Sequence, residues 1–225
     1  MALDFSKMME VQITADGSST LFVPSMEEHY HSTNGAIQES QHVYIEAGFN
    51  QCKKKRIQVL EMGFGTGLNA LLTCLEAQKR GVSVVYTSIE KFPLSLDLVD
   101  KLNYSKCLGL PANDLFRQMH ESPWGEIIEI RPHFFLRKLH IDFADYLFAD
   151  PCDVVYYDAF APNKQAEVWE KGFFSSIYDT MLDMGVLTTY CAKGNIRRML
   201  QEVGFTVFRI AGPPGKREML RAVKD

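Results

Sequence analysis

The sequence predicts a three-layer α/β fold around a mostly parallel sheet, and three observations lead to this prediction. Short apolar runs typical of buried strands alternate along the chain with stretches whose leucines recur at helical spacing. A glycine turn at residues 63–67 joins an apolar run to the first such helix. Residues 211–218, between the last two expected strands, are too few for a crossover helix, so these two strands should be antiparallel.

The elements are expected in the following order. Residues 11–14 and 20–23 alternate in polarity around the turn Ala15-Asp16-Gly17-Ser18, and they should form an amino-terminal hairpin. The polar stretch at residues 27–41 should be a long loop of the kind that often carries function. The strands expected in the sheet are residues 57–62, 82–89, 126–131, 134–143, 154–157, 186–190, 205–210 and 219–223. The helices expected beside it are one that begins at Leu68 and three at residues 93–102, 167–182 and 195–203, while residues 103–125 are ambiguous.

Length and composition fit one domain with a small appendage. The chain has 225 residues, of which 46% are hydrophobic and 23% charged, so it can bury a sizeable core without metal or disulfide cross-links. We expect a hairpin and substrate-loop extension at residues 1–50 and the main domain at residues 51–225. The five cysteines are odd in number and include no CxxC pair, which argues against a disulfide framework and a cysteine zinc site.

The same composition predicts a cytoplasmic protein. Reduced thiols are the simplest reading of the cysteines. The first fourteen residues contain acids and no apolar core, so no secretory leader is expected, and no run of about 18 apolar residues suggests a membrane span.

Charge is distributed unevenly. The net charge is −4, which gives no bulk support to nucleic-acid binding. Residues 193–225 nevertheless hold eight basic and three acidic residues, and residues 53–56 are all basic. These two segments are the candidates for contact with a phosphate backbone.

The glycine turn predicts a nucleotide cofactor. Glycines between a strand and a helix let a ligand approach the backbone closely. A dinucleotide fingerprint would need glycine or alanine at Leu68. The pattern that begins at Glu61, E-x-G-x-G-x-G, instead resembles motif I of S-adenosylmethionine-dependent methyltransferases. In that class the acid that ends the next strand, here Glu90, accepts hydrogen bonds from the ribose hydroxyls.

A third acid should meet the adenine amino group. Asp145 follows Ala144 after the strand expected to end at Phe143, and Asp142 is a nearby competitor. The resemblance to methyltransferases implies the following cofactor-binding residues: Glu61, Gly63, Gly65, Thr66, Gly67, Asn69, Glu90, Lys91 and Asp145.

Asp158 is the candidate catalytic residue. It ends an apolar strand and begins the run D-A-F-A-P, at the edge where open α/β sheets bind ligands. This run, with Lys164 and Trp169 downstream, resembles the signature of the methyltransferase part of MnmC, the bacterial tRNA wobble-uridine enzyme. Further matching motifs are Asp16-Gly17, Tyr30 with Ser32, Asn34-Gly35 with Glu39, residues 62–69, residues 90–94, residues 194–198, Gly204-Phe205 and residues 216–220.

The match has small departures and one large one. Ala159 and Ala144 stand where the family often has glycine. The length leaves no room for the family's flavin-dependent oxidase half, so we expect a stand-alone, Rossmann-like class I methyltransferase that receives its amine from an upstream enzyme.

The resemblance implies methyl transfer from S-adenosylmethionine to the amine of 5-aminomethyl-2-thiouridine in the anticodon stem-loop of tRNA. Asp158 would hold and orient this amine, and it could also take the excess proton. Orientation ranks first, because a carboxylate beside an ammonium favours the charged form, which is not nucleophilic. The substrate-binding residues implied are Tyr30, Asn34, Glu39, Phe160, Pro162, Lys216 and Arg217.

Three alternatives stay open at this stage. The chain could methylate a small amine or another RNA nucleotide. It could be a polyamine synthase-like aminopropyltransferase, which uses a similar fold and strand-end aspartates. It could be a non-catalytic RNA-binding module, although such a module would not need the glycine turn, Glu90 and Asp158 together.

Overall fold

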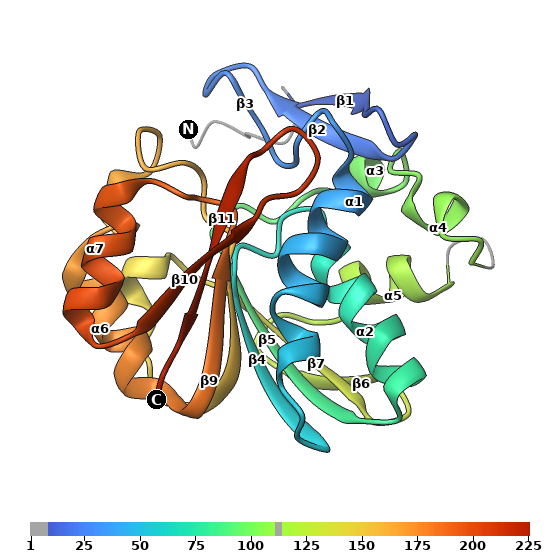
Figure 1. Cartoon of the computed structure of the whole chain (residues 1–225). Coiled ribbons are helices and arrows are strands. Elements are labelled where there is room, and N and C mark those ends of the chain that lie inside the picture. Colours follow the sequence, from blue (N-terminus) through green and yellow to red (C-terminus); the bar gives the residue numbers. More distant parts are fainter. Residues whose placement is uncertain (1–8, 111–113) are drawn as a thin grey trace.

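The computed structural model describes residues 9–110 and 114–225, so the first eight residues, on which the expectation about a leader partly rests, lie outside it. Its largest feature is a sheet with helices on both faces (Figure 1). The strands of this sheet are β4 (Arg56–Met62), β5 (Ser83–Glu90), β6 (Ile127–Arg131), β7 (Phe134–His140), β8 (Cys152–Tyr157), β9 (Met181–Thr189), β10 (Thr206–Ala211) and β11 (Glu218–Val223). The helices are α1 (Ala36–Ser40), α2 (Leu68–Arg80), α3 (Leu96–Val99), α4 (Tyr104–Cys107), α5 (Asp114–Glu121), α6 (Lys171–Thr180), α7 (Gly194–Val203), the π-helix η2 (Gln41–Glu46) and the 3-10 turns η3 (Phe49–Gln51), η4 (Phe143–Asp145) and η5 (Ala166–Val168).

The sheet is mostly parallel, as predicted. Within the described residues its strands lie in the order β10-β11-β9-β8-β4-β5-β7-β6. The strands β4, β5, β7, β8 and β9 pair in parallel. The strand β11 is antiparallel to both β9 and β10, which confirms the antiparallel final pair. The chain moves outward from β4 to β5 and β7 and then returns to the other side of β4 as β8, so a topological switch point lies between β4 and β8.

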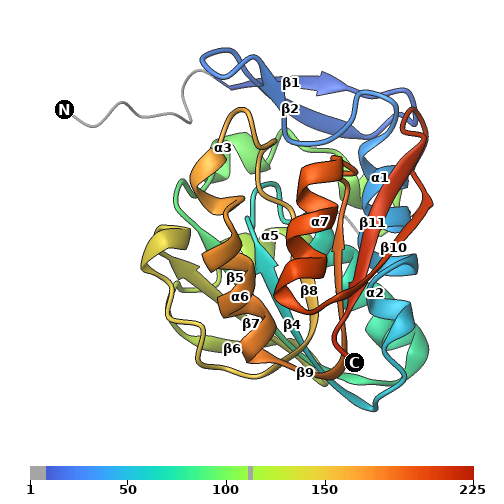
Figure 2. The ribbon, with the colours of Figure 1, turned by 60° about the vertical axis from the view of Figure 1, so that its left-hand side comes forward.

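Each face of the sheet has its own hydrophobic core. On one face α1, η2, α2 and α5 pack against the sheet around side chains such as Val59, Leu71 and Tyr86. On the other face α6 and α7, which lie in front of the sheet in Figure 2, pack around Leu60, Phe174 and Leu200. The strands β4 and β8 are buried on both faces because side chains alternate between these two cores.

A second, smaller sheet lies at the carboxyl ends of the parallel strands (Figure 1). It contains β1 (Glu10–Ile13), β2 (Ser19–Val23) and β3 (Glu28–His29), which pair antiparallel. The predicted hairpin is therefore confirmed. The backbone N–H of Gln38 donates to Asp16 Oδ2 over 3.0 Å, and Asn103 Oδ1 accepts from the N–H of Ser19 over 2.8 Å. These bonds fasten the small sheet to the main fold.

One loop prediction and two helix predictions were inaccurate. The stretch at residues 27–41 was expected to be a loop, but α1 and η2 occupy residues 36–46 and bury Val43, Tyr44 and Ile45. The helix expected at residues 93–102 covers only Leu96–Val99, and the one expected at residues 167–182 covers Lys171–Thr180. In the last case Met181 already pairs with Cys152, so its strand pairing ends the helix earlier than the apolar spacing suggests.

None of the helices in the part of the chain that the structure describes has the length and apolarity that a membrane span requires.

Candidate active site

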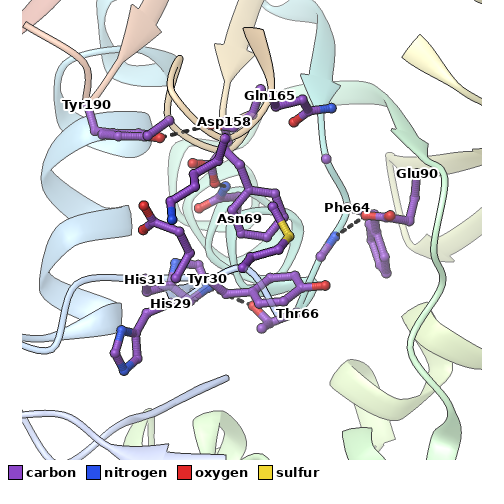
Figure 3. Close-up of a pocket in the computed structure, with 18 of the residues that line it drawn as sticks. His29, Tyr30, His31, Phe64, Thr66, Asn69, Glu90, Asp158, Gln165 and Tyr190 are labelled. Atoms are coloured by element: carbon purple, nitrogen blue, oxygen red, sulfur yellow. Dashed lines mark hydrogen bonds between the residues drawn. The ribbon is translucent and has the colours of Figure 1, made fainter. Parts of the chain in front are cut away.

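A cavity of about 560 Å³ opens at the carboxyl ends of β4, β5 and β8 (Figure 3). The turns after these strands form its floor, and the segment around β3 together with the loop between β10 and β11 forms its other walls. The predicted site residues that line it are Tyr30, Glu39, Gly63, Gly65, Thr66, Asn69, Glu90, Lys91, Asp158, Phe160 and Lys216. Segments up to 186 residues apart therefore meet in one place, at the switch point where α/β sheets bind ligands.

The glycine turn is held open by its backbone and by Glu90. Gly63, Gly65 and Gly67 have φ values of 99°, 49° and 74°, which side chains other than glycine rarely adopt. The N–H of Gly65 donates to Glu90 Oε2 over 2.9 Å, and the N–H of Phe92 donates to Glu90 Oε1 over 2.7 Å. Burial raises the pKa of Glu90, while these two donors oppose that rise.

The buried His31 and the half-buried His120 support the same turn. His31 Nε2 and Thr66 Oγ1 share a hydrogen bond of 2.8 Å, and the Nε2–H of His120 donates to the carbonyl of Thr66 over 3.0 Å. Burial lowers the pKa of both imidazoles to about 4, so they are neutral at pH 7. Thr66 is thereby fixed from both sides without adding charge to the cavity.

Asp158 follows β8 directly and is held by two donors. The hydroxyl of Tyr44 donates to its Oδ1 over 2.5 Å, and the amide of Asn69 donates to its Oδ2 over 2.8 Å. Burial raises the pKa of Asp158 to about 7, although both hydrogen bonds favour the ionised form. The carboxyl group therefore gains and loses a proton near neutral pH, as a group that handles an amine proton requires.

Aromatic rings and an ion pair also line the cavity. The rings of Tyr30 and Phe160 meet edge to face with their centroids 5.3 Å apart. Lys216 Nζ lies 2.7 Å from Glu39 Oε1 and 4.2 Å from the centroid of the Tyr190 ring. Such a wall suits a flat, polar ring carrying a small amine.

Of the two acids that the sequence offers for an adenine contact, Asp142 lines the cavity and Asp145 does not. Asp145 is exposed and does not line the cavity, although the structure describes it. Asp142 does line the cavity, and it pairs with Lys91. This ion pair lowers the pKa of Asp142 and raises that of Lys91, so both are charged at neutral pH.

Five other predicted residues are described by the structure but lie outside the lining of the cavity. They are Glu61, Gly67, Asn34, Pro162 and Arg217. Glu61 is fully buried beneath the site, where Ser88 Oγ donates to its Oε2 over 2.6 Å and burial raises its pKa to about 8. Gly67 precedes α2 as its N-cap. Asn34 is exposed and packs against Gly215, Pro162 is half-buried, and Arg217 is exposed.

Sequence reasoning missed Tyr44, Tyr190, His31 and His120. Tyr190 follows β9 directly, so the strand-end argument that singled out Asp158 could also have found it. Tyr44 lies just after the polar stretch at residues 27–41, in a π-helix where the sequence predicted no element.

The comparisons with known proteins agree with this geometry. A family model described as S-adenosyl-L-methionine-dependent methyltransferase matches residues 133–225. The fold and the site define a Rossmann-like methyltransferase that uses S-adenosylmethionine. More narrowly, the chain is similar to MnmC proteins in two ways.

The first kind of similarity is in sequence. The tRNA 5-methylaminomethyl-2-thiouridine biosynthesis bifunctional protein MnmC of Leptospira borgpetersenii is 29% identical over 85% of this chain and 31% of its own length. The protein of the same name from Burkholderia thailandensis is 27% identical over 89% of this chain and 33% of its own length. The chain thus spans about a third of the length of these curated relatives.

The second kind is in structure. The crystal structure of MNMC2 from Aquifex aeolicus superposes with a TM-score of 0.73 at 27% identity, over 95% of this chain and 70% of the other. Spermidine synthase from Thermotoga maritima superposes with a TM-score of 0.53 at 12% identity, over 92% of this chain and 68% of the other, which shows a shared fold alone.

Proposed function

We propose that this protein methylates the primary amine of 5-aminomethyluridine, with or without the 2-thio group, at the wobble position of tRNA. The observation that carries the proposal is the place of Asp158. It lines the same cavity as the glycine turn, Glu90 and the aromatic rings of Tyr30 and Phe160. The names of the MnmC relatives support the choice of tRNA as the substrate.

The residues present fit S-adenosylmethionine. A Cβ on Gly65 would lie 3.0 Å from the Tyr30 ring, so the cradle requires glycine there. Glu90 keeps a lone pair on each oxygen for the ribose hydroxyls, and Phe64 offers a buried ring beside the turn. Asp142 takes over the adenine contact expected of Asp145, because it lines the cavity. When bound, the cofactor supplies an electrophilic methyl group on a sulfonium sulfur.

Asp158 performs two tasks in this proposal. Its carboxylate accepts a hydrogen bond from the substrate amine and so directs the nitrogen lone pair, which is the larger effect. With a pKa of about 7 it also accepts a proton from the ammonium form of the substrate before transfer and passes it to water. The neutral amine then forms the new carbon–nitrogen bond as the carbon–sulfur bond breaks, and the product is a secondary ammonium.

Lys216 acts inside the cavity in this proposal. The sequence suggested that it meets a tRNA phosphate, but its ammonium is held by Glu39 and covers the Tyr190 ring. We infer that Lys216 donates to a carbonyl oxygen of the pyrimidine. The exposed Arg217 keeps the role of a phosphate contact, as do Arg197 and Arg198 of α7 and residues 53–56. Asn34 and Pro162 stay predictions as substrate contacts at the rim.

The wider context follows from the same chemistry. The amine must come from an upstream enzyme that removes a carboxymethyl group or builds the aminomethyl group directly. We place the reaction in the cytoplasm, and we keep residues 1–50 as a substrate-side extension of a methyltransferase domain at residues 51–225.

Nucleoside analysis tests the proposal. The protein is incubated with isotopically labelled S-adenosylmethionine and tRNA from cells that lack this activity, and the nucleosides are identified by mass spectrometry. The proposal predicts label in 5-methylaminomethyl nucleosides. Label in another nucleotide, or a polyamine product from decarboxylated cofactor and a diamine, would contradict it.

A further inference from the structure

Tyr44 contacts the catalytic carboxylate from behind. Its hydroxyl donates to Asp158 Oδ1, yet its side chain does not line the cavity, so it meets neither the cofactor nor the substrate directly. The residue is 1% exposed. Burial and the neighbouring carboxylate raise the pKa of Tyr44 well above its usual value, so the phenol keeps its proton and remains a donor.

The π-helix η2 brings Tyr44 to this position. The helix α1 ends at Ser40, and the chain continues directly as η2 from Gln41. Short π-helical segments are rare and frequently occur at functional sites, because the wider turn re-aims a side chain. The ring of Tyr156 packs against that of Tyr44 at 5.1 Å, and Gly48 leaves room for the Tyr44 carbonyl, which a Cβ would approach to 2.6 Å. The phenol is therefore firmly placed.

Asp158 is consequently fixed at both oxygens by two different elements. Tyr44 of η2 holds Oδ1, and Asn69 of α2 holds Oδ2. A carboxylate with one donor on each oxygen cannot rotate without losing a bond, and each oxygen keeps a lone pair for an amine. The other ionisable groups around Asp158 and Tyr44 are Glu39 of α1, Glu61 of β4, Tyr86 of β5, Tyr156 of β8, Tyr190 after β9 and Lys216 of the loop between β10 and β11.

We propose that Tyr44 is a positioning residue of the methyl transfer, which fixes the orientation of the Asp158 carboxylate and favours its ionised form. The catalytic part of this inference rests on the proposed function, whereas the effect on the carboxyl group does not. Removal of the hydroxyl should leave cofactor binding intact, loosen the carboxylate and make Asp158 harder to ionise.

Carbon-13 NMR titration tests the effect on the carboxyl group without any substrate. The Asp158 resonance is assigned by its loss in Asp158→Asn, and its midpoint is compared in wild type, Tyr44→Phe and Tyr156→Phe. Tyr156 is the matched control, because its buried hydroxyl bonds to Thr73 rather than to Asp158. We expect the midpoint to rise by about one pH unit in Tyr44→Phe and to stay unchanged in Tyr156→Phe.

Kinetics test the catalytic part. The acid limb of the pH profile of kcat/KM should move upward with the NMR midpoint in Tyr44→Phe, with kcat reduced at least about tenfold at pH 7 and an unchanged affinity for S-adenosylmethionine. Equal midpoints and equal pH profiles in the two phenylalanine variants would overturn the inference.

A further variant keeps the test decisive if Tyr44→Phe does not fold. With 3-fluorotyrosine at position 44, the phenol is a stronger donor, and the Asp158 midpoint should fall. An unchanged midpoint in this variant would also overturn the inference. If wild type transfers no methyl group to 5-aminomethyluridine, the proposed function fails, while the titration still decides whether Tyr44 controls Asp158.

Discussion

Lys216 Nζ lies 2.7 Å from Glu39 Oε1 and joins the loop between β10 and β11 to α1, 177 residues earlier in the chain. The second oxygen of Glu39 accepts from the N–H of Ser32 over 2.7 Å, so the carboxylate also fastens the segment after β3. One buried acid therefore holds two walls of the cavity together.

The first prediction concerns this ion pair. Lys216→Met should raise the KM for the tRNA acceptor about tenfold and lower stability by about 1–3 kcal/mol, because Glu39 loses its cationic partner. Affinity for S-adenosylmethionine should change little. Steady-state kinetics and urea denaturation measure these effects.

Arg217→Met is the matched control for Lys216. Arg217 is exposed, so its loss should weaken tRNA binding at low salt and have little effect at high salt. If both variants showed the same salt-dependent loss, Lys216 would be a surface contact rather than a cavity residue.

The second prediction concerns the glycine turn. Gly65→Ala should weaken the binding of S-adenosylmethionine at least about tenfold by calorimetry, because the new Cβ would press on the Tyr30 ring at 3.0 Å. Gly81 has a similar positive φ of 61° but open space around it. Gly81→Ala is therefore the control that adds the backbone strain without a steric clash. Equal losses of affinity in both variants would refute a cofactor cradle at Gly65.

The third prediction separates Asp142 from Asp145. Asp142→Asn should weaken the binding of S-adenosylmethionine about tenfold, because the charged acceptor in the cavity and the partner of Lys91 are lost. Asp145→Asn should leave affinity within about twofold, since this residue is exposed outside the lining. The reverse order would restore the assignment to Asp145.

The fourth prediction concerns Glu61 and pH. Its pKa is raised from 4.5 to about 8 in the folded state by burial, so folding disfavours the carboxylate. The wild type should therefore lose stability as pH rises from about 4.5 to about 8, by an amount on the order of 4 kcal/mol from this group. Glu61→Gln, which resembles the protonated acid, should be free of this loss.

Urea denaturation at pH 5, 7 and 9 measures the effect of Glu61. The stability gain of Glu61→Gln over wild type should be largest at pH 9 and smallest at pH 5. A gain that did not depend on pH would mean that Glu61 is not a buried acid with a raised pKa.

The parts of the fold that local patterns determine could be predicted from the sequence. The strand at residues 57–62, the glycine turn after it and the helix α2 are each determined by residues close together in the sequence. All three formed as expected. The run at residues 154–157 placed Asp158 at a strand end in the same way.

The rest depended on contacts between distant segments. The stretch at residues 27–41 reads as a polar loop, yet its last part is helical and continues into η2, whose Val43, Tyr44 and Ile45 are buried where η2 packs against α2 and β9. The assignment of Asp145 followed strand spacing, whereas the pairing of Asp142 with Lys91 arises only when β5 and β7 lie side by side. Tyr44, Glu39 and Lys216 likewise meet near Asp158 only in the folded chain.

Single-turnover methyl transfer tests the central claim most directly. Two synthetic anticodon stem-loops are used, one with 5-aminomethyluridine and the other with unmodified uridine at the wobble position, together with S-adenosylmethionine labelled in its methyl group. Label should pass to the first stem-loop alone, and Asp158→Asn should lower the rate at least about a hundredfold while still binding the cofactor. Labelling of unmodified uridine, or a rate in Asp158→Asn equal to that of wild type, would contradict the account.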